Sequence, residues 1–268
     1  MCRRILTPLF FLSFLLFCAP LSAYADTIVD ADIVVDTTWT KAGSPYLVQG
    51  WITIDQGATL SVEPGVTVQI ELVDGFGKID VLGRLLAQGT SDEPILFTST
   101  GDWSGIEFSN PDAASALNHV VVERAYSVTD FYSKDLSISH TKIKDSYFGV
   151  RTYGSRLSLD YFSAENISGD AVDVSYGSNV VLEHIALKDV GAGVEVYVGS
   201  TATISDLSVE RSQNEALSVY DGSSATVASS CAIVVVSQSS LAMSASVVSR
   251  SMRSSWCGQS TYLIRFSG

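Results

Sequence analysis

Polar and charged side chains recur through the middle of the chain at a spacing that would stack them on one face of a repeating fold. Within this set, Asp173 and Glu195 would lie on adjacent coils about 5 Å apart, the strand spacing of a sheet. That separation resembles the close carboxylate pair of a retaining glycosidase. Arg151, one coil before Asp173, could clamp an acidic sugar or act as the base of a lyase. The outward column contains Glu107, Thr129, Arg151, Asp173, Glu195 and Ser218, with spacings of 22, 22, 22, 22 and 23 residues.

A simpler interpretation of this column is a polar outer surface. Outward positions of a solenoid are polar by default, and Arg151 with Asp173 would then form a surface ion pair that contributes less than about 1 kcal/mol. No dense cluster of acidic residues with His, Lys or Arg partners appears by motif. We therefore expect ligand binding or a structural role rather than catalysis, with Glu107, Arg151, Asp173 and Glu195 as ligand-binding candidates and Asp173, Glu195 and Arg151 as weak catalytic ones.

A series of tyrosines closes the repeats, each shortly before a serine. Their rings could stack against sugars, which makes Tyr153, Tyr176 and Tyr197 further ligand-binding candidates. The alternative, which we favour, is a corner ladder in which the rings stack on one another and contribute about 0.5–1.5 kcal/mol per pair. The series is Tyr132, Tyr153, Tyr176, Tyr197 and Tyr220.

Other site signatures are absent from the sequence. His119, His140 and His184 share no metal-ligand spacing, and the repeat does not place them in one column, so we expect no metal site. There is no Gly-x-Ser-x-Gly elbow, P-loop or Gly-x-Gly-x-x-Gly motif. Calcium would suit the acidic surplus, but the Asp-rich nonapeptide of calcium-binding β-rolls is missing. We expect no cofactor.

The elements that must position these residues are short strands in a solenoid. A small residue followed by an apolar one recurs with the same period, which indicates a repeat architecture. Further aliphatic columns, such as Leu159, Leu182 and Ile204, would stack into a continuous core. Each turn between strands carries glycine or serine; glycine allows positive φ, and serine can bind a neighbouring amide. The dipeptides are Gly105-Ile106, Ser127-Val128, Gly149-Val150, Ala171-Val172, Gly193-Val194 and Ala216-Leu217.

Three segments near the start of the repeats read GATLSVEPGVTVQI, GKIDVLGRLLAQGTSDEPILFTS and DWSGIEFSN. They resemble the opening coils of bacterial secreted right-handed parallel β-helix proteins with PbH1-type repeats. The resemblance implies an all-β, single-stranded right-handed parallel β-helix of about ten coils of roughly 22 residues. The family includes pectin- and alginate-degrading enzymes, adhesins and scaffold modules, so it leaves the function open.

The two ends of the chain differ from the repeats. Residues 1–25 combine Arg3 and Arg4, an apolar run and Ala23-Tyr24-Ala25, which is typical of a cleaved signal peptide and predicts a secreted or cell-surface protein without a membrane span. We expect an N-terminal cap over 26–45 and a β-helix over 46–268, regular over 105–222 and looser over 223–268. The strand around Leu263 has no polar cap after it, which allows self-association at that edge.

The net charge of the chain limits the classes of partner that we expect. Residues 1–25 contain two of the 16 basic residues and none of the 29 acidic ones, so the formal charge changes from −13 to −15 on cleavage. Such a charge argues against nucleic acid and anionic membranes as partners.

Cys231 and Cys257 remain after cleavage and predict a disulfide worth about 3 kcal/mol, with two free buried thiols as the alternative. We expect a structural, adhesive or polysaccharide-binding module, with a polysaccharide lyase or glycoside hydrolase as the alternative.

Overall fold

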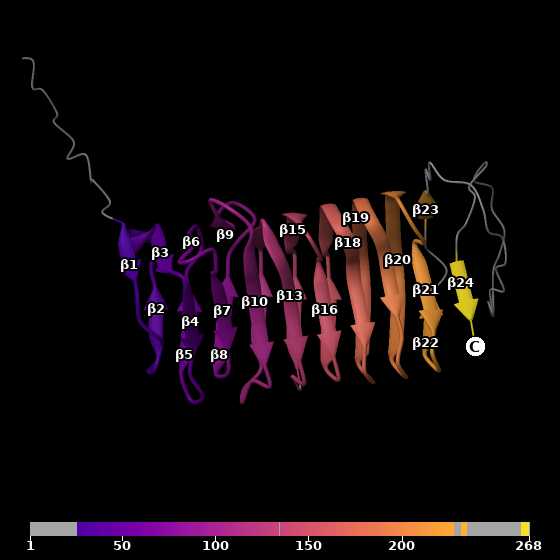
Figure 1. Ribbon diagram of the computed structural model, residues 1–268, viewed down its shortest axis with the longest axis horizontal. Helices are drawn as coiled ribbons and strands as arrows, with labels where there is room; N and C mark the ends of the chain where they lie inside the picture. The colour runs from indigo at the N-terminus through magenta and orange to yellow at the C-terminus, as the bar shows by residue number, and fades with distance from the viewer. Residues whose placement is uncertain (1–25, 134, 228–231, 235–263, 268) are drawn as a thin grey trace, which may run out of the picture.

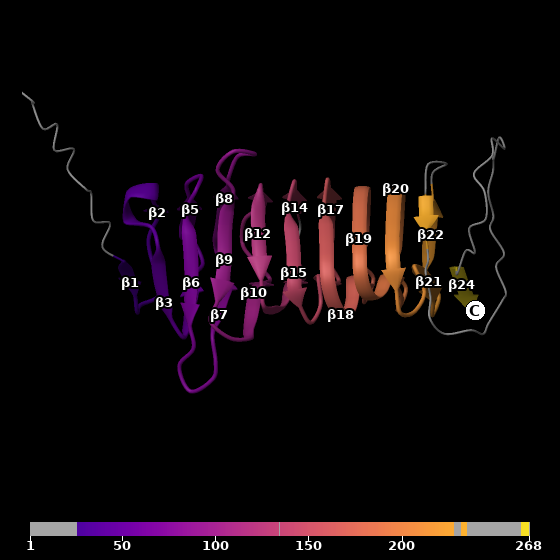
Figure 2. The same ribbon diagram turned by 90° about the horizontal axis from the view of Figure 1, so that it is seen from above.

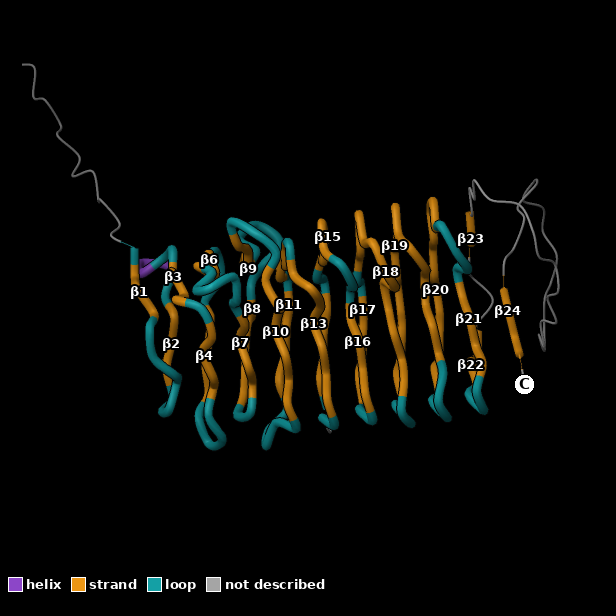
Figure 3. Tube along the Cα trace, viewed as in Figure 1, coloured by secondary structure: helices purple, strands orange, loops and turns teal. Residues whose placement is uncertain are grey.

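The chain folds into a parallel β-solenoid of about nine turns, whose coils follow one another along the long axis of the molecule (Figure 1). The computed structural model describes residues 26–133, 135–227, 232–234 and 264–267. Strands and short turns alternate throughout, as Figure 3 shows. The described part of the chain contains one helical element, the 3₁₀ turn η1 (Lys41–Gly43), and none of its helices is long and apolar enough to cross a membrane. The all-β prediction is confirmed.

Each full coil contributes to three parallel sheets, which we call first, second and third. Along the chain, a coil enters the third sheet, then the second, and then the first. The first sheet contains β4 (Trp51–Ile54), β7 (Lys78–Val81), β10 (Trp103–Ser109), β13 (Ala125–Phe131), β16 (Val150–Tyr153), β21 (Leu217–Tyr220) and β24 (Ile264–Ser267). The second contains β1 (Thr27–Val29), β3 (Tyr46–Gln49), β6 (Thr67–Glu71), β9 (Ile95–Ser99), β12 (Val120–Glu123), β15 (Lys142–Ser146) and β23 (Ala232–Val234). The third contains β2 (Thr37–Trp39), β5 (Thr59–Val62), β8 (Arg84–Gln88), β11 (Ser115–Asn118), β14 (Leu136–Ser139), β17 (Arg156–Asp160) and β22 (Ser224–Val227).

Three long strands bend around corners and so belong to more than one sheet. They are β18 (Ser163–Ser175), β19 (Asn179–Val196) and β20 (Thr201–Ser212). β19 takes part in all three sheets, because its successive segments pair with β17, with both segments of β18, and with β20 and β21. Seen from above in Figure 2, the stacked coils form a regular column. The sheets are therefore continuous along the axis, and one residue position defines a row of side chains on successive coils.

The interior is filled by aliphatic columns that the period-two alternation of the strands points inward. Leu159, Leu182 and Ile204 are in register on β17, β19 and β20 and are fully buried, as predicted. The apolar members of the small-apolar dipeptides form another column, from Ile106 to Leu217, with no member more than 1% exposed. Like-on-like stacking of this kind removes each side chain from water against its neighbours above and below.

The small residue of the dipeptide is required by a close approach between coils. A Cβ added to Gly149 would lie 2.1 Å from the carbonyl oxygen of Ala171, and one added to Gly193 would lie 2.1 Å from that of Ala216. No side chain fits at these distances, so glycine is needed where the next coil's carbonyl points at the Cα. The dipeptide therefore sets the packing of adjacent coils as well as the register.

A ladder of serines stabilises the corner between the first and third sheets. The amide of Ser133 donates to Oγ of Ser155 (3.2 Å), Ser155 to Ser178 (3.1 Å), and Ser178 to Ser200 (3.2 Å). The amide of Ser200 in turn donates to Oγ of Ser223 (2.9 Å). Each bond provides an acceptor for an amide in a tight turn at the edge of the interior. The expectation that these serines bind neighbouring amides is confirmed.

The ends of the chain are described only in part. Residues 27–39 form the first coil, because β1 pairs with β3, β2 with β5, and Ile33 bridges to Ile54. The predicted signal peptide (1–25), the cysteine pair Cys231–Cys257 and Leu263 lie outside the described residues. β24 pairs with β21 at the end of the first sheet. Self-association at that edge stays a prediction.

Candidate functional site

The predicted column of polar residues exists on the outer side of the first sheet. Glu107, Thr129, Arg151, Asp173, Glu195 and Ser218 are direct register partners on successive coils. The column is less exposed to solvent than the expected polar outer surface. Asp173 is only 2% exposed, and Thr129 and Ser218 are also buried, whereas Arg151 and Glu195 are half-buried. The column is therefore the floor of a built surface, and the interpretation of a plain solvated face is wrong.

Two rows, each with aromatic members, flank this floor. One row lies two residues after the column and contains Phe131, Tyr153, Ser175, Tyr197 and Tyr220. The other lies three residues before it and contains Tyr126, Phe148, Asp170, Ala192 and Glu215. Arg151 has an aromatic ring on each side, Phe148 in one row and Tyr153 in the other. We call the three rows together the first-sheet face.

Arg151 is held rigidly at the centre of the first-sheet face. Its Nε donates to Oδ2 of Asp173 at 3.2 Å, and its guanidinium carbon lies 4.3 Å from the ring centre of Phe148 and 5.2 Å from that of Tyr153. The Arg151 and Asp173 side chains are 19% and 3% exposed. The expected surface ion pair is thus a largely buried one, sandwiched between two rings, where cation–π attraction adds to the charge pairing.

Asp173 is the most enclosed carboxylate of the face. Its Oδ2 accepts from Arg151 and also from the hydroxyl of Tyr197 at 3.3 Å, while its Oδ1 is buried with no hydrogen-bond partner among the described residues. Burial raises the pKa of Asp173, and the contacts with Arg151 and Tyr197 oppose that rise. One oxygen of this group is therefore an unused acceptor beneath the surface.

Two further carboxylates surround Asp173. Burial raises the pKa of Asp170 to about 6, helped by repulsion from Glu195 and Asp173. Burial likewise raises the pKa of Glu195, and repulsion from Asp173 adds to the rise, whereas the hydrogen bond from the Tyr220 hydroxyl (3.2 Å) lowers it. Three mutually repelling carboxylates with raised pKa values on one surface are typical of functional sites. Among the residues that the structure describes, no group of three or more His, Cys, Asp or Glu side chains is arranged to hold a metal ion.

The tyrosine series divides into two sets, contrary to the prediction of one series. Tyr153, Tyr197 and Tyr220 belong to a row of the first-sheet face, and Tyr197 stacks on Tyr220 with ring centres 5.3 Å apart. Tyr132 and Tyr176 lie one residue later, in the turn, where both have φ of +56°. Tyr176 reaches Tyr153 only as a tilted contact at 5.7 Å. Rings of the series therefore stack on adjacent coils only in part, and the prediction of a continuous tyrosine ladder is wrong.

Glu107 lies outside the cluster around Arg151. Thr129 separates the two in the column, and Glu107 instead accepts from Lys78 Nζ (3.1 Å) and Ser109 Oγ (3.0 Å). Lys78 also packs over the ring of Trp51, with Nζ 4.2 Å from the ring centre. The column is continuous in backbone register, but its charged groups form two separate networks.

The histidines do share a column, which the sequence reasoning missed. His119 stacks on His140 (4.5 Å between ring centres), His140 on Tyr161 (4.8 Å), and Tyr161 on His184 (4.2 Å). Each occupies a corner position with positive φ. The irregular spacings of 21, 21 and 23 residues concealed the column, and including Tyr161 as its third member would have revealed it.

Three members of the first-sheet face that act on its charged groups, Asp170, Phe148 and Tyr220, were missed as site residues. Phe148 and Asp170 are register neighbours in the row three residues before the column. The same repeat applied to that position would have found both. Tyr220 belonged to the tyrosine series but was not expected to bind Glu195.

Comparison with known proteins supports the architecture. A family model described as a right-handed β-helix region matches residues 98–249, and one described as a pectate-lyase-like β-helix domain matches residues 31–115. No curated protein and no solved structure matches the chain. The first match covers more than half of the sequence and most of the described coils. The chain therefore belongs to the right-handed β-helix family.

Proposed function

We propose that the protein is a secreted, non-catalytic β-helix module that binds polysaccharide on the first-sheet face, in an adhesive or structural role. The observation that carries the proposal is the fixed row Arg151, Asp173 and Glu195 between two rows that contain aromatic rings. Flat rings suit the apolar faces of sugars, and carboxylates and guanidinium groups suit their hydroxyls. Because the side chains already hold one another in place, little ordering would be needed on binding.

The charge of the face favours an uncharged polysaccharide. The three rows contain five carboxylates, those of Glu107, Asp170, Asp173, Glu195 and Glu215, against the one guanidinium of Arg151. At neutral pH this surplus would repel a polyuronate such as pectate or alginate. A neutral glycan has no such penalty and offers hydroxyl donors to carboxylate acceptors.

Burial of Asp173 is the reason to favour binding over catalysis. A retaining glycosidase needs two carboxyl groups that both reach the sugar, but the Asp173 side chain is 3% exposed, with Oδ2 engaged by Arg151 and Tyr197. The alternative function, a glycoside hydrolase or polysaccharide lyase, rests on a different residue. Asp170 is half-buried with a pKa of about 6, which suits a general acid near neutral pH.

The test combines binding with turnover. Isothermal titration with uncharged oligosaccharides is expected to show binding that Tyr197→Ala weakens at least fivefold, because the variant loses a ring and the hydroxyl bound to Asp173. Tyr161→Gly removes an exposed ring from a remote corner and is expected to change nothing. Release of reducing ends or unsaturated products that Asp170→Asn abolishes would establish the enzymatic alternative instead.

A further inference from the structure

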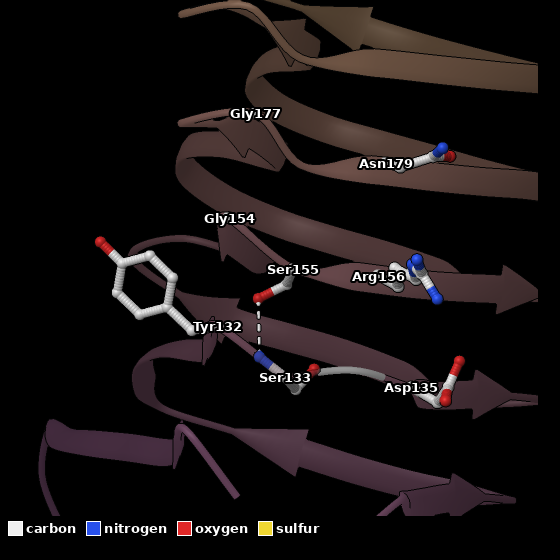
Figure 4. A pocket seen from close by; sticks show the side chains of 8 residues that line it. All are labelled: Tyr132, Ser133, Asp135, Gly154, Ser155, Arg156, Gly177 and Asn179. Carbon is white, nitrogen blue, oxygen red and sulfur yellow. Dashed lines mark hydrogen bonds between the residues drawn. The ribbon is translucent and has the colours of Figure 1, made fainter.

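A groove runs along the corner where the chain leaves the first sheet for the third. It encloses about 600 Å³ and lies over three successive coils. Figure 4 shows its lining residues, with the Tyr132 ring projecting from one side and polar side chains on the strands of the other. The lining consists of Tyr132, Ser133, Asp135, Gly154, Ser155, Arg156, Gly177 and Asn179. None of these residues belongs to the three rows of the first-sheet face.

Exposed tyrosine rings mark this corner on alternate coils. Tyr132, which lines the groove, is 59% exposed, and Tyr176, which directly precedes the lining residue Gly177, is 57% exposed. They lie two coils apart, which corresponds to roughly 10 Å along the axis. That distance is about the length of a disaccharide in an extended polysaccharide.

The coil between the two tyrosines carries Gly154 at the equivalent position. A Cβ added to Gly154 would lie 2.7 Å from Cδ1 and Cε1 of Tyr132, so the ring rests against the glycine backbone. At Gly177 no atom lies within 4 Å of the place of a Cβ. The intervening coil has no ring of its own at this position, and the Tyr132 ring lies over its backbone, whereas the space beside Gly177 is open.

The wall on the third-sheet side offers hydrogen-bonding groups of balanced charge. Asp135, Arg156 and Asn179 are exposed on consecutive coils, with Arg156 and Asn179 in direct register. One carboxylate, one guanidinium and one amide give donors and acceptors with no net formal charge. The floor is rigid because the amide of Ser133 is bonded to Oγ of the buried Ser155.

We propose that this groove binds a disaccharide-long stretch of an uncharged, extended polysaccharide, lying parallel to the solenoid axis with sugars against Tyr132 and Tyr176. The polar wall would bind the sugar hydroxyls. The proposal rests on the proposed function for the class of ligand, but it names a different surface. The tilted contact between Tyr153 and Tyr176, at 5.7 Å, places the two surfaces side by side.

The experiment uses variants that preserve the turn. Because Tyr132 and Tyr176 have positive φ, which glycine adopts without strain, Tyr132→Gly and Tyr176→Gly remove the rings without a backbone penalty. Tyr161→Gly, at φ +49°, is the matched control. Cello-, xylo-, manno- and chito-hexaose are the probes, titrated into the full chain by calorimetry, with circular dichroism to verify folding.

The expected result is a loss of affinity of at least fivefold in Tyr132→Gly and Tyr176→Gly and no change in Tyr161→Gly. Arg156→Ala, which leaves both rings in place, is expected to weaken binding as well. Loss of affinity in Tyr197→Ala alone would overturn the proposal that the groove binds sugar and would retain the proposed function of the first-sheet face. Loss of affinity in Tyr132→Gly and Tyr176→Gly alone would support binding in the groove and overturn binding at the first-sheet face. No binding of any probe would overturn both.

Discussion

Asp130 is a carboxylate inside the solenoid, and replacing it should stabilise the protein in a pH-dependent way. It is fully buried in an interior column, between Phe108 and Thr152 on the neighbouring coils. Its Oδ2 accepts from Oγ of Ser133 at 2.7 Å, but its Oδ1 and the Oγ1 of Thr152 have no partner among the described residues. Burial raises its pKa from 3.8 to about 6, although the hydrogen bonds of Ser133 and Ser155 lower it.

The magnitude follows from this difference in pKa. A pKa of about 6 in the folded protein against 3.8 in the unfolded chain corresponds to a penalty of about 3 kcal/mol for the ionised group, fully present above pH 6. Because the folded state binds the proton more tightly, acidification through pH 6 toward pH 3.8 removes the penalty. Asp130→Asn should therefore raise the free energy of unfolding by up to about 3 kcal/mol at pH 7.5 and by less than about 1 kcal/mol at pH 4.

The measurement is urea unfolding of wild type and Asp130→Asn at pH 4, 5, 6 and 7.5. Differences between the two proteins isolate the group, because other titrating residues such as Asp170 contribute equally to both. Asp92→Asn removes the same charge at an exposed position and should change the free energy of unfolding by less than about 0.5 kcal/mol. A difference for Asp130→Asn that is constant across the range, or a destabilisation that grows with pH, would refute the reasoning.

Two further predictions concern the contacts between coils. Gly149→Ala should destabilise the protein by at least about 2 kcal/mol in urea unfolding, because its Cβ would overlap the Ala171 carbonyl oxygen; stability within about 0.5 kcal/mol of wild type would show that the coils separate easily. Ser155→Ala should cost about 1–3 kcal/mol by leaving the buried amide of Ser133 without its acceptor, and rapid amide exchange at Ser133 should accompany the loss; unchanged protection of that amide would contradict the serine ladder.

Backbone register was predictable from the sequence because repeated dipeptides specify it. Gly149 and Gly193 are needed for steric reasons and lie two coils apart, with Ala171 at the equivalent point of the coil between them, so the spacing of the small residues marks equivalent points of the coils. Once those points are aligned, the inward columns and the outward column follow from the alternation of a strand. This is why Arg151 and Asp173 were placed side by side correctly.

Burial and corner geometry were not predictable in the same way. Asp173 is enclosed by side chains from the flanking rows, and a single column contains no information about them. Tyr176 falls out of the row of Tyr153 because the turn after β18 is one residue longer than the turn after β16, which the average repeat length conceals. Irregular spacing at another corner concealed the stacked His119 and His140.

The central claim is that the first-sheet face binds uncharged polysaccharide without cleaving it. The most direct measurement is calorimetric titration of the full chain at pH 7.5 with cellohexaose, xylohexaose, mannohexaose and chitohexaose, and in parallel with oligogalacturonate, while products are monitored. We predict saturable binding of an uncharged oligosaccharide, weakened by Tyr197→Ala, with no binding of oligogalacturonate and no product. Tighter binding of oligogalacturonate, or release of product from any of these sugars, would contradict the account.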